Sequence, residues 1–207
     1  MRLFLSSYRF GGHEDHFLRL AGTGRRAIVI ANACDAWPTS ARAAAVTSDV
    51  VPLQRLGFAV RELDLRHNVD IRRELSACDV LWVRGGNTFV LRSRCARSGA
   101  DEALTSMLHD DAFLYAGYSA GACLATPTLR GLESADPPQE ARTTCGTDPI
   151  FDGLGLVDHA IVPHWQSPEL GEAGRHVVTT LTRLGVRYWT LRDDQAVLID
   201  GNRREFV

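Results

Sequence analysis

The chain has 207 residues, of which 45% are hydrophobic and 23% are charged, and its formal net charge at pH 7 is −2. Such a composition is typical of one globular domain with a buried core, and so small a net charge does not favour a nucleic-acid or anionic-membrane partner. The 23 basic residues are all arginines, which excludes lysine Schiff-base chemistry, and no apolar run approaches the roughly 20 residues that cross a bilayer.

The first seven residues are typical of a strand rather than of a signal peptide, so we expect a cytoplasmic protein. From there, short apolar runs alternate with segments of helical character. The predicted strands are Leu3–Ser6, Ala27–Ala31, Ala59–Leu63, Val80–Val83, Phe113–Ala116, Ala160–Val162, Tyr188–Leu191 and Ala196–Ile199. The predicted helices are Thr39–Leu56, Thr88–Arg97, Asp101–His109 and Pro168–Leu184.

Prolines, glycines and small polar residues set the expected ends of these helices. Pro52 is expected to kink the first predicted helix or to end it early. Ser167 is expected to cap the last one, with Pro168 at its first helical position and Gly185 as its C-terminal stop. Because strands and helices alternate, and because several strands are almost continuously apolar, we expect one domain, residues 1–207, built on a parallel sheet with helices on both faces.

A G-x-S-x-G pattern, Gly117–Gly121, lies between an apolar run and a helix-forming run. This strand–turn–helix setting is the one in which the pattern carries chemistry. Its two glycines lack the Cβ atoms that would crowd a sharp turn. Ser119 would stand at a helix N-terminus, where developing negative charge is favoured. We therefore interpret Ser119 as a catalytic nucleophile, against the alternative of an ordinary Gly-Ser turn.

A serine hydroxyl needs a base within hydrogen-bonding distance, and the base needs an orienting group. His164 follows the apolar run Ala160–Val162, so we expect it at the same carboxyl edge of the sheet as Ser119. A purely structural histidine is the alternative. For the orienting acid we favour Asp193, in a turn between two late strands. The other candidate acids are Asp194, Asp136 and Asp158.

The other histidines and the cysteines indicate neither a metal site nor disulfides. His13 and His16 resemble a metal-binding pair, but no third ligand stands at a recognisable spacing. The cysteines are odd in number and widely spaced and include no C-x-x-C, so we expect reduced thiols rather than disulfides or a zinc site. They are Cys34, Cys78, Cys95, Cys123 and Cys145.

The oxyanion that forms when the serine attacks a carbonyl needs preorganised N–H donors. The N–H of Ala120 is one candidate. The second is the N–H of Gly86, in the glycine turn after the run Val80–Val83, with Asn87 fixing that turn. A phosphate-binding loop is the weaker alternative, because the turn has neither G-x-G-x-x-G nor a Walker lysine.

The segment Pro127–Asp158 is rich in Gly, Pro, Asp and Thr and has no clear periodicity. A loop of this length inside a compact domain is usually functional or disordered. Because it separates Ser119 from His164, we interpret it as a wall or lid of the site, against the alternative of a mobile insertion without a role.

Three blocks, Arg84–Phe89, Gly117–Ala122 and Pro163–His164, together resemble the peptidase E (aspartyl dipeptidase) family of serine peptidases. The order and spacing of the blocks fit this family over nearly the whole chain. The resemblance implies a class I glutamine amidotransferase-like fold: a three-layer α/β sandwich with a mostly parallel, flavodoxin-like sheet. It also implies a Ser–His–acid triad that needs no metal, and we expect no cofactor.

Within this resemblance, Ser119 matches the family nucleophile and His164 its base, whereas Asp193 stands where the family has a glutamate. Asp136 lies near a second acidic position of the family. The aspartyl dipeptidases use an arginine after the histidine block to bind the acidic side chain of the substrate. The residues that we expect to bind substrate are Asn87, Arg84 and Arg175, with Arg142 as a further candidate for a substrate carboxylate.

We therefore expect a serine hydrolase that cleaves small peptides through an acyl-enzyme, with N-terminal aspartyl dipeptides implied by the resemblance. The expected partner is a small peptide substrate, not nucleic acid or a membrane, and homodimer formation is left open. One alternative is an esterase of the α/β-hydrolase type, although that fold places the acid before the histidine in the chain. The other is a non-catalytic ligand-binding member of the same fold. A glutamine amidotransferase would carry a cysteine where Ser119 stands.

Overall fold

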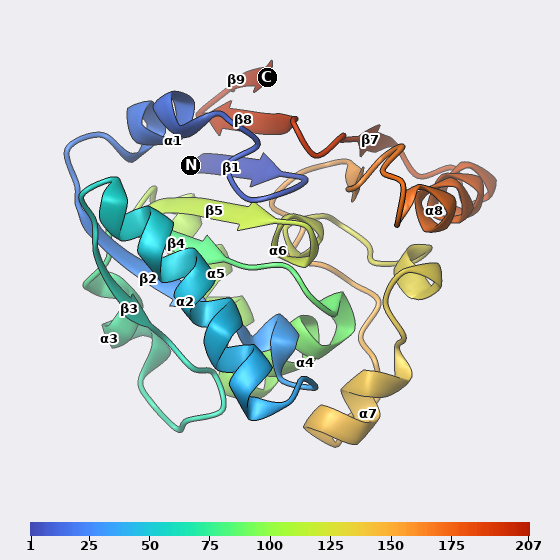
Figure 1. Ribbon diagram of the computed structural model, residues 1–207, viewed down its shortest axis with the longest axis horizontal. Helices are drawn as coiled ribbons and strands as arrows, with labels where there is room; N and C mark the ends of the chain where they lie inside the picture. Colours follow the sequence, from blue (N-terminus) through green and yellow to red (C-terminus); the bar gives the residue numbers. More distant parts are fainter.

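Strands from both ends of the chain come together in one seven-stranded sheet, and the computed structural model describes all residues from 1 to 207 (Figure 1). In spatial order its strands are β3 (Ala59–Glu62), β2 (Arg26–Ile30), β4 (Val80–Val83), β5 (Leu114–Tyr118), β1 (Arg2–Ser6), β8 (Ala196–Asp200) and β9 (Arg203–Phe206). The first five are parallel, β8 pairs antiparallel with β1, and β9 pairs antiparallel with β8. The prediction of an α/β fold with a mostly parallel sheet is confirmed.

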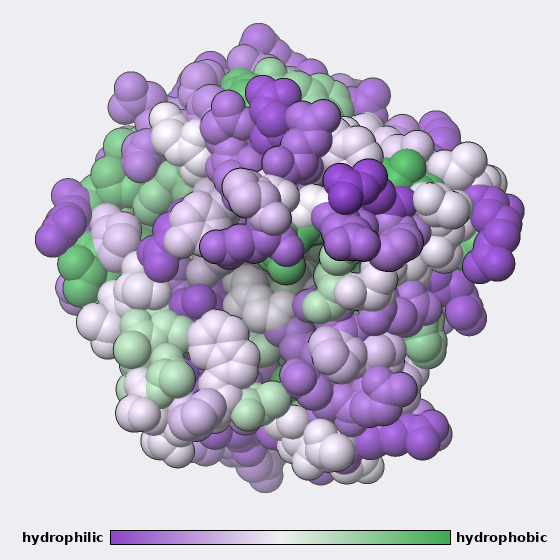
Figure 2. Space-filling view, turned by 45° about the vertical axis from the view of Figure 1, so that its right-hand side comes forward, coloured by the Kyte–Doolittle hydropathy of each residue, from purple (hydrophilic) through white to green (hydrophobic).

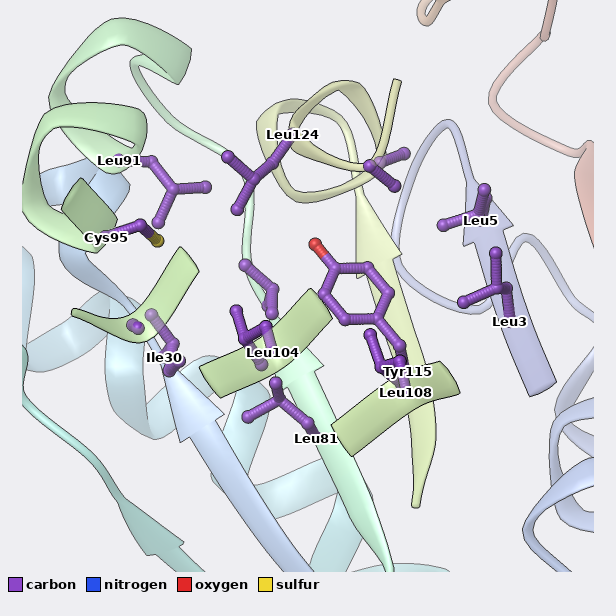
Figure 3. Close-up of a cluster of buried hydrophobic side chains, with 14 of the residues drawn as sticks. Leu3, Leu5, Ile30, Leu81, Leu91, Cys95, Leu104, Leu108, Tyr115 and Leu124 are labelled. Carbon is purple, nitrogen blue, oxygen red and sulfur yellow. The ribbon is translucent and has the colours of Figure 1, made fainter. Parts of the chain in front are cut away.

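Helices cover both faces of the sheet because its strands carry large apolar side chains on both faces. Along β1, Leu3 and Leu5 belong to one buried cluster, and Phe4 belongs to the cluster on the opposite face. The helices on the Phe4 face are α1 (Glu14–Ala21) and α2 (Thr39–Arg55). Those on the other face are α3 (Ile71–Ser76), α4 (Thr88–Ser98), α5 (Ala100–His109) and α6 (Ala120–Leu124). Figure 3 shows side chains of α4, α5 and α6 packed against those of β1, β2, β4 and β5.

Helix α2 continues through Pro52 to Arg55, so the expected early end of this helix is wrong. A proline has no N–H to donate to the carbonyl of Ser48, four residues earlier. That carbonyl instead accepts a hydrogen bond from the Arg9 guanidinium at 2.6 Å. The proline is tolerated because the lost bond is replaced and because it lies in the last turn of the helix.

A second, two-stranded parallel sheet lies outside the first. It consists of β6 (Ala160–Val162) and β7 (Tyr188–Thr190), which pack against α8 (Gly171–Arg183). Helix α8 begins at Gly171 rather than at Pro168, because Ser167 caps a turn that precedes the helix. Its Oγ accepts a hydrogen bond from the N–H of Leu170 at 3.0 Å. Gly185 follows the helix with a φ of +67°, which confirms the predicted stop.

The elements that were not predicted are short or polar. They are α1, α3, α7 (Gln139–Cys145), the edge strand β9, and the 3-10 turns Asn32–Cys34 and Leu132–Ser134. Two of them lie within the segment Pro127–Asp158, which is therefore folded rather than one long loop. Its end is tied to the residue after α6 by a hydrogen bond from the N–H of Leu156 to the carbonyl of Ala125 at 2.8 Å.

The cysteines and the candidate metal pair take ordinary positions in this fold. All five cysteines are buried free thiols. His13 contacts the carbonyl oxygen of Asp194 at 2.8 Å through Nε2, and no group of three or more His, Cys, Asp or Glu side chains is placed to hold a metal ion. None of the helices combines the length and the apolar character that crossing a membrane requires.

Candidate active site

Ser119 stands on the tight turn between β5 and α6, with φ 51° and ψ −117°. Few residues other than glycine adopt a positive φ. The turn closes because backbone packs directly on backbone. A Cβ on Gly117 would lie 2.4 Å from the carbonyl oxygen of Gly121, and a Cβ on Gly121 would lie 2.1 Å from that of Val83. The two glycines of the G-x-S-x-G pattern therefore permit the contact that presents Ser119 at the carboxyl edge of the sheet.

His164 and Asp193 complete a continuous hydrogen-bonded chain with this serine. The Ser119 Oγ lies 2.9 Å from Nε2 of His164, and Nδ1 of His164 lies 2.6 Å from Oδ1 of Asp193. The two partners come together because His164 follows β6 and Asp193 follows β7, and parallel strands end at the same edge of a sheet. The structure thus brings together three residues that the sequence singled out.

Ser7 also belongs to this chain, and the sequence analysis missed it. Its Oγ donates to Oδ1 of Asp193 at 2.9 Å and accepts a hydrogen bond from the N–H of His164 at 2.7 Å. The residue is fully buried. It follows β1, whose last residue pairs with the last residue of β5, so the register places Ser7 beside Ser119. The only signal in the sequence is a polar pair of serines at the end of an apolar run.

Of the four candidate acids, only Asp193 contacts His164. Asp194 forms an ion pair with a neighbouring arginine at 3.3 Å. Asp158 contacts the adjacent histidine at 2.7 Å. Asp136 accepts two hydrogen bonds from the N-terminus of α4.

The glycine turn after β4 lies directly against Ser119. A Cβ on Gly85 would lie 2.9 Å from the Cβ of Ser119, and a Cβ on Gly86 would lie 2.6 Å from the carbonyl oxygen of Ala33. The N–H of Gly86 donates to no acceptor in the protein. Ala120 is the first residue of α6, and the first N–H groups of a helix have no acceptor within it. Both predicted donors therefore have uncommitted N–H groups, and both residues line a cavity together with Ser119.

A buried ion-pair network connects the turn at Ser119 with the glycine turn after β4. Asp49, on α2, is fully buried and lies 2.8 Å from the Arg84 guanidinium and 3.1 Å from the hydroxyl of Tyr118. Burial raises the pKa of the Asp49 carboxyl, while the neighbouring arginines lower it. Arg84 also donates to the carbonyl of Gly85 at 3.1 Å. Asp49 thereby connects the residue before Ser119 with the glycine turn.

Asn87 connects the glycine turn with the segment Pro127–Asp158. Its Oδ1 caps α4 by accepting hydrogen bonds from two N–H groups of the first helical turn. Its Nδ2 donates to the carbonyl of Pro137 and to the carboxylate of Glu140, each at 3.0 Å. The position of Asn87 therefore depends on both the helix and the segment that faces it.

A cavity of about 320 Å³ opens beside Ser119 and His164. The segment Pro127–Asp158 supplies one wall, as interpreted from the sequence, and the opposite wall comes from β6 and α8. Its apolar lining includes Leu132, Ala135, Val162, Leu170 and Val177, and its carboxylates are Asp136 and Glu140. Figure 2 shows this side of the molecule. Its surface is hollowed near the centre, and hydrophilic residues form much of the rim.

None of the predicted substrate-binding arginines offers a free guanidinium to this cavity. Arg84 is buried in its ion pair with Asp49 and borders only the neighbouring part of the cleft. Arg175 is exposed on α8 and does not line the cavity. Arg142 pairs with a surface aspartate at 2.9 Å.

Comparisons with known proteins identify relatives of this chain. The profile of peptidase family S51 matches residues 14–207. An uncharacterized peptidase from Listeria innocua is 30% identical over 149 residues, which cover 71% of this chain and 68% of the relative. A peptidase E from Streptomyces coelicolor is 35% identical over 100 residues, which cover 47% of this chain and 36% of the relative.

Two crystal structures share the fold. One, from Listeria monocytogenes EGD-e and described as a peptidase E protein, has a TM-score of 0.82 and 25% identity. That superposition covers 100% of this chain and 97% of the other. A peptidase from an acI-B1 actinobacterium has a TM-score of 0.72 at 13% identity, over 100% of this chain and 86% of the other.

Proposed function

Since this chain belongs to peptidase family S51 and is a serine peptidase, we propose that Ser119 is its nucleophile, His164 its general base and acid, and Asp193 the group that orients the histidine. The observation that carries the proposal is the unbroken hydrogen-bonded chain, 2.9 Å from serine to histidine and 2.6 Å from histidine to aspartate. An aspartate that accepts the Nδ1 proton leaves Nε2 free to accept the proton of the serine.

In the first half of the reaction, the Ser119 Oγ attacks the carbonyl carbon of the scissile peptide bond while Nε2 of His164 takes the hydroxyl proton. Negative charge moves onto the carbonyl oxygen, where the N–H groups of Gly86 and Ala120 stabilise it. The imidazolium then gives its proton to the leaving nitrogen, the peptide bond breaks, and an acyl-serine remains. Throughout, Asp193 stabilises the positive charge on the histidine.

In the second half, water attacks the acyl-serine while His164 takes a proton from that water. The same two N–H groups hold the second oxyanion. The imidazolium then returns its proton to the Ser119 Oγ, and the carboxylic acid product leaves. Cavities of about 320 Å³ and about 490 Å³ both border Ser119 and His164, and each has the volume of a small-molecule site, which suits a small peptide substrate.

No specific contact supports either alternative, a ligand-binding protein or an esterase of the α/β-hydrolase type. Contact between Ser119 and His164 at 2.9 Å argues against a purely ligand-binding role. The proposed acid follows the histidine in the chain, unlike the order in α/β-hydrolase esterases. Five buried free thiols are consistent with a cytoplasmic location, which remains part of the proposal together with the small peptide substrate.

Dipeptide hydrolysis by purified variants tests the proposal. Ser119→Ala should abolish turnover without lowering the melting temperature. Asp193→Asn should lower kcat by roughly three to four orders of magnitude, as expected when the orienting acid of a triad loses its charge. Asp194→Asn is the matched control, because it removes the adjacent carboxylate, which does not contact His164. Full activity in Ser119→Ala, or equal losses in the two aspartate variants, would contradict the proposal.

A further inference from the structure

The cavity beside Ser119 is acidic at its inner wall. Asp136, which precedes α7, and Glu140, in the first turn of α7, both line it, and no arginine does. The rest of its lining is largely apolar. When Ser119 attacks the carbonyl of a substrate residue, the nearest atoms of that residue must lie in this cavity or in the neighbouring part of the cleft. Ser119 and His164 line both.

Each of the two carboxylates has one oxygen without a protein donor. Oδ2 of Asp136 accepts hydrogen bonds from the N–H of Thr88 at 2.9 Å and from its hydroxyl at 2.5 Å, whereas Oδ1 accepts none. Oε2 of Glu140 accepts one from Asn87 at 3.0 Å, and Oε1 accepts none. Burial raises the pKa of the Asp136 carboxyl, and the charge of Glu140 acts in the same direction, although the bonds from Thr88 oppose it. Asp136 is thus a half-buried carboxyl in a cavity that no arginine lines.

An anionic substrate side chain would find no cation in the same space, and the N–H groups of Gly86 and Ala120 are needed there for the oxyanion. The first N–H groups of α4 are already bonded to Asn87 and Asp136. The Arg84 guanidinium borders the neighbouring part of the cleft, but it is only 10% exposed and is paired with Asp49. A substrate carboxylate in the cavity would therefore lose its water and meet two negative charges.

We propose that this cavity binds an ammonium group on the acyl-side residue of the substrate and disfavours an acidic residue there, with Asp136 and Glu140 as the specificity-determining residues. The inference rests on the proposed function of Ser119. An N-terminal ammonium is separated from the attacked carbonyl carbon only by Cα, so its partners must lie close to the nucleophile, and Asp136 and Glu140 line a cavity that Ser119 also lines. A lysine side chain also carries an ammonium group, at the end of a longer aliphatic chain.

The test is a panel of dipeptides that differ only in the charge of the acyl-side residue: Ala-Ala, Lys-Ala, Asp-Ala, and the N-acetyl forms of Ala-Ala and Lys-Ala. The value of kcat/KM for Ala-Ala should exceed that for Asp-Ala and for N-acetyl-Ala-Ala by roughly tenfold or more, as expected for the loss of a hydrogen bond to a charged group. If N-acetyl-Lys-Ala alone among the acetylated peptides is cleaved well, the bound ammonium is that of the side chain.

Glu140→Gln keeps the shape of the side chain and its bond from Asn87 while removing the charge. It should raise KM for the unblocked peptides and bring the ratio of Ala-Ala to N-acetyl-Ala-Ala toward one. Glu172→Gln, on the exposed first turn of α8 and outside the cavity, removes the same charge and should change neither value. Asp136→Asn provides a second variant with the same expected direction.

Two outcomes would overturn this inference: equal kcat/KM values for the acetylated and free peptides, or a preference for Asp-Ala that Glu140→Gln leaves unchanged. If Ser119→Ala is inactive, the proposed function stands in either case. A wild-type protein that cleaves none of the peptides would overturn the proposed function and this inference with it.

Discussion

Replacing Ser7 with alanine tests whether a buried hydroxyl holds the histidine and the aspartate in place. The variant removes the hydrogen bond that Ser7 donates to Oδ1 of Asp193 at 2.9 Å and the acceptor of the His164 N–H at 2.7 Å. A hydrogen bond to a charged group contributes roughly 1.5–3 kcal/mol, and about 1.4 kcal/mol of barrier is tenfold in rate. We therefore expect kcat for a cleaved dipeptide to fall roughly ten- to hundredfold. KM should change little, because Ser7 lines neither part of the cleft.

Ser93→Ala is the matched control for this experiment. Ser93 is equally buried, but its hydroxyl has no hydrogen-bond partner, so its removal breaks no hydrogen bond. This variant should keep the wild-type kcat and should not lower the free energy of unfolding. Steady-state kinetics with thermal denaturation of each variant separate a positioning effect from unfolding. A Ser7→Ala protein that is folded at the assay temperature and has a kcat within twofold of wild type would refute the reasoning.

Gly121→Ala should prevent the turn at Ser119 from closing, because its Cβ would lie 2.1 Å from the carbonyl oxygen of Val83, and little folded protein should be recovered in a thermal denaturation assay. Asp49→Ala should lower the free energy of unfolding by about 3 kcal/mol or more, because it leaves the Arg84 guanidinium buried without its anion; denaturation by urea measures this. Asp79 accepts hydrogen bonds from an arginine side chain and two N–H groups at the start of β2, and these hold the pKa of its carboxyl at about 2. Because that pKa is below its unfolded value, Asp79→Asn should be less stable than wild type above about pH 4, and the difference should disappear as the pH falls through 2.

Local signals were sufficient for the serine and its turn. The glycines of Gly117–Gly121 stand within four residues of each other, and the backbone contacts that require them lie between adjacent elements. His164 followed from a general property of parallel strands, although β6 turned out to belong to a separate small sheet. Asp193 meets His164 because β7 is the partner of β6, a pairing that no local pattern encodes.

Ser7 could not have been found in the same way. It is 157 residues from His164 and 186 from Asp193, and the three meet only through the strand order of the folded sheet. The edge strand Arg203–Phe206 lacks the apolar alternation of a buried strand because most of it faces solvent. Helix Gln139–Cys145 was missed because packing against α4, rather than helical periodicity, stabilises it. The start of the last helix was misplaced for a related reason, since Ser167 caps a turn rather than a helix.

The most direct test of the central claim is the site of covalent modification by a fluorophosphonate, located by mass spectrometry of the digested protein. The hydrogen-bonded chain predicts a single adduct on Ser119, formed much more slowly in Asp193→Asn and absent in Ser119→Ala. An adduct on a different residue, or labelling of Ser119→Ala at the wild-type rate, would contradict it.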